Sequence, residues 1–225
     1  MKLQNFAENQ WIAGVDDGKP LASAVDGHTV ATISSAGIDF GGMLDYARRT
    51  GGSQLRQYTF HDRAFMLKDL AKYLMERKQA LYQLSTETGA TKSDSWVDID
   101  GGISTLFVYS SKGRREMPND KVYLDGPPEV LSREGTFVGQ HILTPKHGAA
   151  VHINAYNFPC WGMLEKLAPC LLAGVPAIIK PASSTAYLTE LMVRQIIESG
   201  ILPEGSVQLI CGGVGDLFDH LTCQD

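Results

Sequence analysis

The segment from His152 to Tyr187 constrains the fold more than any other part of the chain. Its sequence, HINAYNFPCWGMLEKLAPCLLAGVPAIIKPASSTAY, passes from a β-prone stretch through a tight turn into an amphipathic helix, which ends at Gly174. A short apolar strand follows and closes on Lys180. This order is typical of a βαβ crossover, whose strands lie parallel in one sheet. Ligands of open α/β sheets bind at the carboxyl ends of the strands, so we expect a site there.

The alternation of strand and helix continues to the end of the chain. Strands are expected over 149–153, 176–179 and 207–210, helices over 163–172 and 186–198, and a further helix begins at 216–221. The pattern predicts an α/β fold with a Rossmann-like parallel sheet and flanking helices. Three strands make only half a dinucleotide site and leave open edges. We therefore expect an incomplete domain from a longer protein.

The first half of the chain is mostly helical. The first 35 residues look irregular, with short extended pieces separated by turns at 16–18 and 26–28. Helices are expected over 39–49, from Thr59 onward, over 81–88 and over 93–109. Gly51-Gly52 is expected to stop the first helix, and Thr59 to cap the second. Gly101-Gly102 inside the last helix indicates close approach by another backbone. Residues 1–117 and 148–225 are assigned to the dinucleotide-binding domain.

Residues 118–147 have a different character. They alternate β-prone runs with Gly and Pro and lack helical periodicity, which predicts antiparallel strands around Val130 and over 137–143. Such a ribbon has an exposed edge unless something covers it. The pattern fits a simple surface hairpin and an oligomerisation arm equally. We assign the segment as an arm of a dimer-based homo-oligomer.

Composition excludes several classes of function. The chain has 225 residues, a net charge of −5 and no clustered Lys/Arg stripe, so nucleic-acid binding is not expected. The N-terminus lacks an apolar signal region, and no run reaches the ~20 apolar residues of a membrane span. A cytoplasmic protein without membrane contact is expected. The four cysteines show neither a C-x-x-C pair nor zinc spacing, so we expect reduced thiols and no metal site.

Small polar and basic residues follow the second strand. Lys180 lies where a cofactor ribose or phosphate would lie, although a solvated lysine after a strand fits the spacing too. The stretch 183–185, Ser-Ser-Thr, contains no acid. Enzymes that prefer NAD often place an acid on the adenosine ribose, whereas small groups admit the 2′-phosphate of NADP. Ser183 therefore favours NADP, and the same residues could also cap the next helix.

The turn before the 163–172 helix contains a carboxamide. Asn157 would present an amide donor at the start of a helix, which is a plausible stabiliser of an oxyanion. No Ser/His/Asp set, metal cluster or thiol with an adjacent base is visible. Cys160 is the one internal nucleophile candidate, because a helix N-terminus lowers a thiol pKa. Phe158-Pro159, however, is expected to turn Cys160 toward the packing face.

Four motifs follow one another in the second half of the chain, AYNFP, KLAP, IIKPAS and ILPEGSVQLICGG. In order and at similar spacing they resemble the (P)WNFP, KLAPAL, KPSE and LPxGVxNxxxG motifs of the aldehyde dehydrogenase superfamily. Longer phrases, TGATKSDSWVDIDGGISTLF, HINAYNFPCWGMLEKLAP and PAIIKPA, are similar to the aldehyde dehydrogenase half of bifunctional phenylacetate-degradation enzymes. That likeness covers nearly the whole chain. Tyr156 stands for the family's Trp and Ala155 for its Pro.

The resemblance implies roles for individual residues. Asn157 matches the amide that holds the oxyanion together with a backbone N–H at the nucleophile. Ser183 replaces the glutamate of NAD-preferring members, which implies NADP. The remaining positions that match cofactor-binding residues are Ile153, Asn154, Ala155 and Tyr156 at the strand end, Lys180 on the adenosine ribose, and Gly213 under the adenine side.

The resemblance also implies an activity. It is the NADP-dependent oxidation of a CoA-linked semialdehyde, 3-oxo-5,6-dehydrosuberyl-CoA semialdehyde, in phenylacetate catabolism. The family's cysteine nucleophile and glutamate base would lie beyond residue 225, as would an enoyl-CoA hydratase-like (oxepin-CoA hydrolase) domain, so this chain alone is expected to be inactive. The alternatives are an aldehyde dehydrogenase of the benzoyl-CoA pathway type, and a non-catalytic nucleotide-binding or assembly module.

Overall fold

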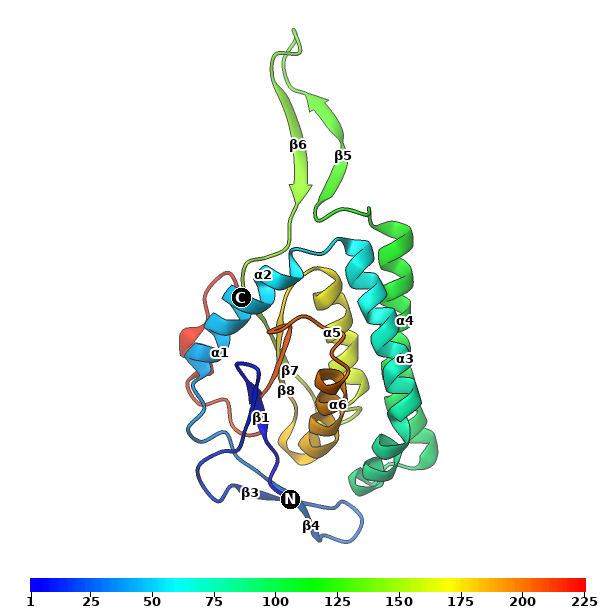
Figure 1. Ribbon diagram of the computed structural model, residues 1–225, viewed down its shortest axis with the longest axis vertical. Helices are drawn as coiled ribbons and strands as arrows, with labels where there is room; N and C mark the ends of the chain where they lie inside the picture. Colours follow the sequence, from blue (N-terminus) through cyan, green and yellow to red (C-terminus); the bar gives the residue numbers. More distant parts are fainter.

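A computed structural model describes residues 1–225 and contains one five-stranded sheet with helices on both faces (Figure 1). The strand order is β2-β1-β9-β8-β7. Strands β7 (Ala150–Ile153), β8 (Ala177–Lys180) and β9 (Val207–Leu209) are parallel, and helices α5 (Trp161–Leu172) and α6 (Ala186–Glu198) connect them. The predicted parallel α/β sheet with flanking helices is therefore confirmed.

The N-terminal residues extend this sheet. Strand β1 (Asn5–Ala7) pairs antiparallel with β2 (Gln10–Ile12), and Phe6 of β1 pairs antiparallel with Leu209 of β9. The short extended pieces expected in this region are present as strands, but the expectation of a three-stranded sheet is wrong, because β1 and β2 extend it to five strands. The missed signal is the two-residue turn Glu8-Asn9, where both residues have positive φ values of 49° and 64°. A two-residue turn with positive φ at both positions matches the twist of a β-hairpin. A separate two-stranded sheet comprises β3 (Lys19–Ala22) and β4 (Thr29–Ile33).

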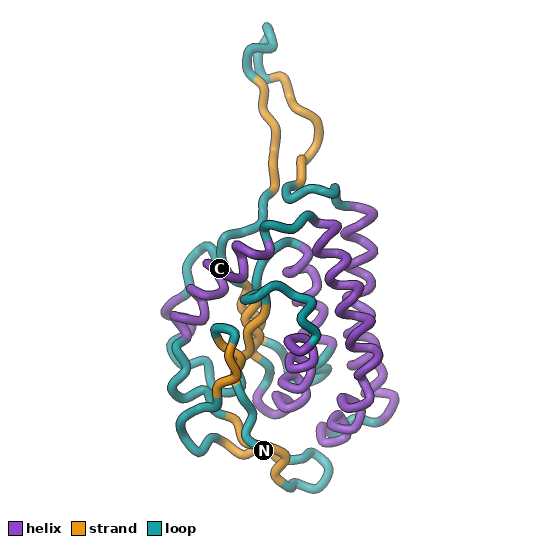
Figure 2. Tube along the Cα trace, in the orientation of Figure 1, coloured by secondary structure: helices purple, strands orange, loops and turns teal.

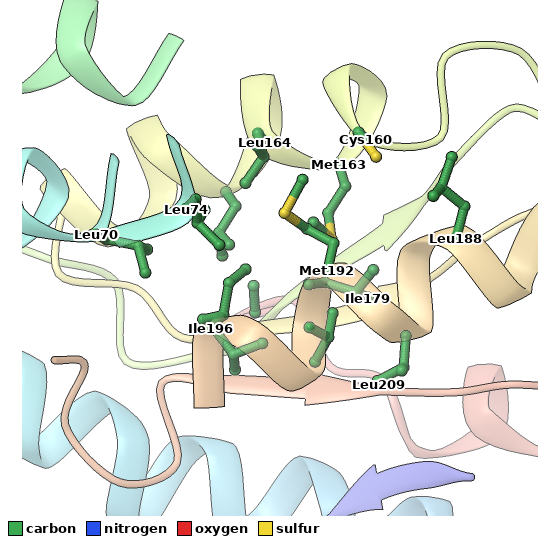
Figure 3. Close-up of a cluster of buried hydrophobic side chains, with 14 of the residues drawn as sticks. Leu70, Leu74, Cys160, Met163, Leu164, Ile179, Leu188, Met192, Ile196 and Leu209 are labelled. Carbon is green, nitrogen blue, oxygen red and sulfur yellow. The ribbon is translucent and has the colours of Figure 1, made fainter. Parts of the chain in front are cut away.

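Alternating side chains divide the sheet into two buried faces. Ile178 of β8 packs with Phe40, Met43 and Leu44 of helix α1 (Phe40–Tyr46). Its neighbour Ile179 points the other way and joins the larger core (Figure 3). Helices α3 (Phe60–Ser85), α5 and α6 supply much of that core, and the Cα trace shows the helices beside the strands (Figure 2). Successive strand residues face opposite sides, so an almost continuous apolar run is what a sheet covered on both faces requires.

Two long helices form the outer layer beside α5 and α6 (Figure 1). Helix α3 (Phe60–Ser85) begins at the predicted cap Thr59, whose side chain forms a capping box with Asp62. It is one helix where two were expected, because nothing interrupts it before a 3₁₀ turn, Thr86–Thr88, that ends at Gly89 with φ of 80°. Helix α4 (Lys92–Glu116) is longer at both ends than expected.

Gly51 does not stop the first helix. After α1 the chain continues through a π-helical turn, Ala47–Gly51, into α2 (Gly52–Leu55). A Cβ atom on Gly51 would lie 2.1 Å from the carbonyl oxygen of Gly205, so this glycine admits a neighbouring backbone. A second difference lies near the C-terminal end of the chain, where the structure has a 3₁₀ turn, Leu217–His220, in place of the helix expected at 216–221.

The predicted ribbon projects from the body of the molecule (Figure 1). It consists of β5 (Tyr123–Val130) and β6 (Val138–Leu143), which pair antiparallel with an irregularity between Asp125 and Glu129. Several of its large apolar side chains are exposed, namely Leu124, Val130, Leu131, Phe137, Val138, Ile142 and Leu143. In the whole structure, no helix combines the length and the apolar character needed to cross a membrane.

Candidate functional site

The carboxyl ends of β7 and β8 lie side by side, as the sequence predicts. Ile153 is opposite Lys180 in the parallel register, and the N–H of Asn154 donates to the carbonyl oxygen of Lys180 at 3.0 Å. The turn that contains Asn157 follows β7 directly, and the 3₁₀ turn Ser183–Thr185 follows β8. The two segments singled out in the sequence therefore meet at one edge of the sheet.

Lys180 is not a solvated lysine. It is only 9% exposed, and its ammonium group donates to the carbonyl oxygen of Pro181. Burial lowers the pKa of Lys180, while the nearby Cys211 acts in the opposite direction. The position of the Lys180 ammonium group at the end of β8 is thus set by burial and by its contact with Pro181.

Ser183 and Gly213 line one cavity of about 340 Å³ at this edge. Its opposite wall comes from the N-terminal segment, with Ser34 and Ser35 after β4 and Lys19 on β3. Lys180 does not line this cavity. The sequence reasoning missed the N-terminal wall completely, since nothing in its pattern points to a ligand.

Gly212 is the glycine that this cavity requires. A Cβ atom there would lie 2.4 Å from the backbone nitrogen of Ser35, and its φ is 153°. Gly213 has no such neighbour, but its carbonyl oxygen accepts a hydrogen bond from the Ser35 hydroxyl at 2.7 Å. The glycine-rich turn thus lets the N-terminal wall approach the end of β9.

Buried Asn5 fixes that wall in place. Its side-chain nitrogen donates to the carbonyl oxygens of Ile12 and Ser34, at 3.1 and 2.9 Å. Its side-chain oxygen accepts the N–H of Cys211 at 2.7 Å. One carboxamide therefore satisfies backbone groups of three segments, and leaving such groups unpaired would be costly.

The turn after β7 exposes four consecutive residues, Ala155, Tyr156, Asn157 and Phe158. Asn157 thus faces outward at the start of α5 rather than toward the protein interior. Phe158 has a φ of 53°, a conformation that costs a residue other than glycine about 1–3 kcal/mol. The hydroxyl of Thr185 donates to the Tyr156 carbonyl oxygen at 3.1 Å and ties the turn to the start of α6.

Cys160 is fully buried in the core (Figure 3). Burial raises the pKa of its thiol well above the usual value, and the neighbouring Asp98 carboxylate raises it further. A thiol must ionise to act as a nucleophile. The environment of Cys160 therefore opposes the chemistry that its position at a helix start suggested, in line with the expected effect of Phe158-Pro159.

The strand-end residues face two directions. Ile153 is 54% exposed, and Ala155 and Tyr156 are also exposed. Asn154 is buried, and neither polar atom of its side chain has a hydrogen-bond partner. His152 is buried too, with Nε2 3.2 Å from the Cys170 sulfur, and burial lowers its pKa to about 4. The predicted set of cofactor residues at this strand end is therefore split between solvent and interior.

Comparison with known proteins shows which family the chain belongs to. The aldehyde dehydrogenase family matches residues 11–225. A 3,4-dehydroadipyl-CoA semialdehyde dehydrogenase from Aromatoleum evansii is 41% identical over 99% of this chain and 43% of its own length. A D-glyceraldehyde dehydrogenase (NADP(+)) from Thermoplasma acidophilum is 30% identical over 99% of this chain and 43% of its own length.

The fold agrees with these sequence matches. The solved structure of a 3,6-anhydro-L-galactose dehydrogenase superposes with a TM-score of 0.81, at 22% identity over 98% of this chain and 44% of that one. The chain thus spans less than half the length of the relatives that it matches. The family match covers residues 11–225 and the 41% identical relative covers 99% of the chain, so the chain belongs to the aldehyde dehydrogenase family.

Proposed function

We propose that residues 1–225 supply the cofactor-binding part and the oxyanion amide of an NADP-dependent dehydrogenase that oxidises a CoA-linked semialdehyde. The observation that carries the proposal is the meeting of two segments at one sheet edge. One is the Asn157 turn after β7, and the other is the acid-free Ser183 turn after β8. In this proposal the cysteine nucleophile and the glutamate base come from residues beyond position 225.

The edge of the sheet fits a dinucleotide. The cavity of about 340 Å³ beside Ser183 and Gly213 lies within the size range of small-molecule sites. Lys180 would donate to the adenosine ribose, and the hydroxyl of Ser183 would face a 2′-phosphate without the repulsion of a carboxylate. Lys19 and Asp16, one charge of each sign, lie at the cavity's N-terminal wall. Bound at this edge, NADP⁺ would supply the acceptor for the hydride that the reacting carbon loses.

Asn157 would act on the aldehyde substrate. Its carboxamide is exposed at the start of α5, and its NH₂ group would donate to the oxygen of the aldehyde as that oxygen becomes negative. The dinucleotide would lie along the strand-end residues between the Ser183 turn and the Asn157 turn, namely Ile153, Asn154, Ala155 and Tyr156. For Asn154 this means the backbone, since its side chain is buried.

Two CoA-linked semialdehydes are candidate substrates. The longer phrases of the sequence resemble enzymes of phenylacetate catabolism, which implies 3-oxo-5,6-dehydrosuberyl-CoA semialdehyde and a C-terminal hydratase-like domain. The relative at 41% identity is instead named for 3,4-dehydroadipyl-CoA semialdehyde. That name makes 3,4-dehydroadipyl-CoA semialdehyde the second candidate. The ratio of kcat/KM for the two aldehydes, measured on the full-length enzyme, decides between them.

The ribbon is proposed to be an oligomerisation arm. Its exposed apolar side chains lie on both strands, from Leu124 to Leu143. Native proteins usually cover such a hydrophobic strand with another part of the chain or with a partner chain. A second copy of the chain is the partner that we propose, which gives a homo-oligomer built from dimers. A monomer in solution would leave the ribbon as a simple surface hairpin.

Residues 1–225 alone are expected to show no aldehyde oxidation above buffer. Burial raises the thiol pKa of three of the four cysteines, Cys160, Cys170 and Cys211. A base that the sequence did not reveal does lie beside Cys170, but burial lowers the pKa of this base, His152, to about 4, which makes it a weak activator of a thiol. The measurement is aldehyde-dependent NADPH production by the purified chain beside the full-length enzyme. Activity of the isolated chain that disappears in Cys160→Ser would overturn the assignment of the nucleophile to a later residue.

Replacement of Ser183 by Glu is expected to shift cofactor preference from NADP toward NAD. A carboxylate beside the 2′-phosphate adds a like-charge contact of about 1–3 kcal/mol, which changes the ratio of kcat/KM values roughly ten- to a hundredfold. Both cofactors are measured on the wild type and on the variant of the full-length enzyme. Ser184→Glu, at the next and also exposed position, is the matched control. An unchanged ratio in Ser183→Glu would place specificity elsewhere.

A further inference from the structure

Asp98 is a buried acid on α4 that has no cationic partner. Asp98 is only 4% exposed, and its carboxylate takes part in none of the ion pairs of the structure. Its carboxylate accepts the backbone N–H of Trp161 at 2.7 Å and that of Cys160 at 3.0 Å. Those two N–H groups lie at the start of α5, directly after the Asn157 turn.

The α5 helix has no cap of its own. Cys160 occupies the N-cap position, and its side chain forms no capping hydrogen bond. The first N–H groups of a helix have no partner within the helix, so another group must satisfy them. Here a carboxylate from a different helix does so, and it also faces the positive end of the α5 dipole.

Glycines on the same face of α4 make this contact possible. Gly101 and Gly102 follow Asp98 by three and four positions, which places all three residues on one side of the helix. A Cβ atom on Gly102 would lie 2.9 Å from the Cα of Trp161, and one on Gly101 would lie 2.9 Å from its ring. The pattern Asp-x-x-Gly-Gly therefore brings α4 close enough for Asp98 to reach the α5 backbone.

We propose that Asp98 is a positioning residue that fixes the start of α5 and thereby orients Asn157. Three side chains bind the backbone of the turn between β7 and α5. Thr185 donates to the carbonyl oxygen of Tyr156, Thr189 donates to that of Pro159 at 3.4 Å, and Asp98 binds the N–H groups that follow. The two threonines hold carbonyl groups of the turn from α6 and its preceding turn, and Asp98 secures its far end from α4.

The cost of burying the Asp98 carboxylate favours a positioning role for this residue over a general contribution to stability. Burying a carboxylate without a cation is costly, and burial raises the pKa of Asp98 although the N–H groups of Trp161 and Cys160 oppose that shift. The strained φ of Phe158 adds a second cost within the same turn. Strained residues persist only where their surroundings over-determine them. Asp98 supplies part of that constraint next to the residue that would contact the substrate.

This inference rests on the proposed oxyanion role of Asn157. A displacement of a catalytic group by about 1 Å can cost about a hundredfold in rate. In the full-length enzyme, Asp98→Ala is therefore expected to lower kcat about ten- to a hundredfold, and to change the Kd of NADP by less than about threefold. Asp98→Asn keeps one oxygen that can accept an N–H, so its loss of kcat should be smaller, about threefold to tenfold.

Asp100→Asn is the matched control. Asp100 is also a buried acid of α4, but it binds Lys78 and Tyr82 of α3 instead of α5. The kcat of this variant should stay within about threefold of wild type. Backbone amide exchange of peptides that contain Cys160 and Trp161 should accelerate in the Asp98 variants and stay unchanged in Asp100→Asn. If Asp98→Ala fails to fold, Asp98→Asn provides the same comparisons.

A double-variant cycle separates positioning from stability. If Asp98 acts through Asn157, Asp98→Asn should have almost no further effect on kcat in the Asn157→Ala background. Independent, multiplicative losses would overturn the inference, as would equal losses of kcat in Asp98→Asn and Asp100→Asn. A slow Asn157→Ala enzyme beside fully active Asp98 variants would refute the role of Asp98 alone. A fully active Asn157→Ala enzyme would instead refute the proposed oxyanion amide.

Discussion

Asn157→Ala in the full-length enzyme is expected to lower kcat by about 10²–10³, while the Kd of NADP changes by less than about threefold. The NH₂ group of Asn157 would meet a negative charge that exists only as the aldehyde oxygen becomes an oxyanion. An interaction made only in the transition state raises kcat and contributes little to ground-state binding. The exposed position of the side chain at the start of α5, on a turn held by Thr185 and Asp98, is consistent with such a preorganised donor.

Asn157→Asp is the matched control for this prediction. The aspartate has nearly the same shape, but its ionised carboxylate cannot donate a hydrogen bond and would repel an oxyanion. It should therefore be at least as slow as the alanine variant. Steady-state kinetics and direct titration of NADP provide the two readouts. A loss of less than about threefold in both variants would leave Asn157 as a structural turn residue.

Arg63→Ala is expected to lower the free energy of unfolding by about 3–5 kcal/mol. Arg63 is a fully buried cation on α3 that binds three backbone carbonyl oxygens instead of a carboxylate. Nε donates to Leu172 at 2.8 Å, and Nη1 donates to Leu55 at 3.2 Å and to Tyr58 at 2.5 Å. Burial lowers its pKa to about 10, so it remains charged at neutral pH. Its removal would leave buried carbonyl groups unpaired, including one at the end of α5.

Urea unfolding of the wild type and the variant measures this change. Arg77→Ala is the matched control, since Arg77 is on the same helix and also lies over an aromatic ring. Its side chain, however, is exposed and binds only neighbours on α3. It should cost less than about 1 kcal/mol. Equal effects of the two substitutions would show that the carbonyl contacts of Arg63 contribute little.

Much of the candidate site could be predicted from the sequence because its signals are local. The apolar run before Lys180, the cap at Thr59 and the turn around Asn157 each depend on residues within a few positions of one another. Their spacing placed Asn157, Lys180 and Ser183 near strand ends, where parallel strands necessarily expose their carboxyl edge. Similarity to a known family then attached roles to these positions.

Sequence patterns alone therefore determined the parallel α/β core, its helices and the ribbon. Only the tertiary structure decided which distant segments complete them. Phe6 pairs with Leu209, Ser35 packs against Gly212, and Asp98 caps a helix that begins 63 positions later at Trp161. None of these partners is encoded by periodicity or by a neighbouring residue. Each contact is selected by the global packing of the chain, because buried strands, backbone groups and charges must find partners wherever the fold brings them.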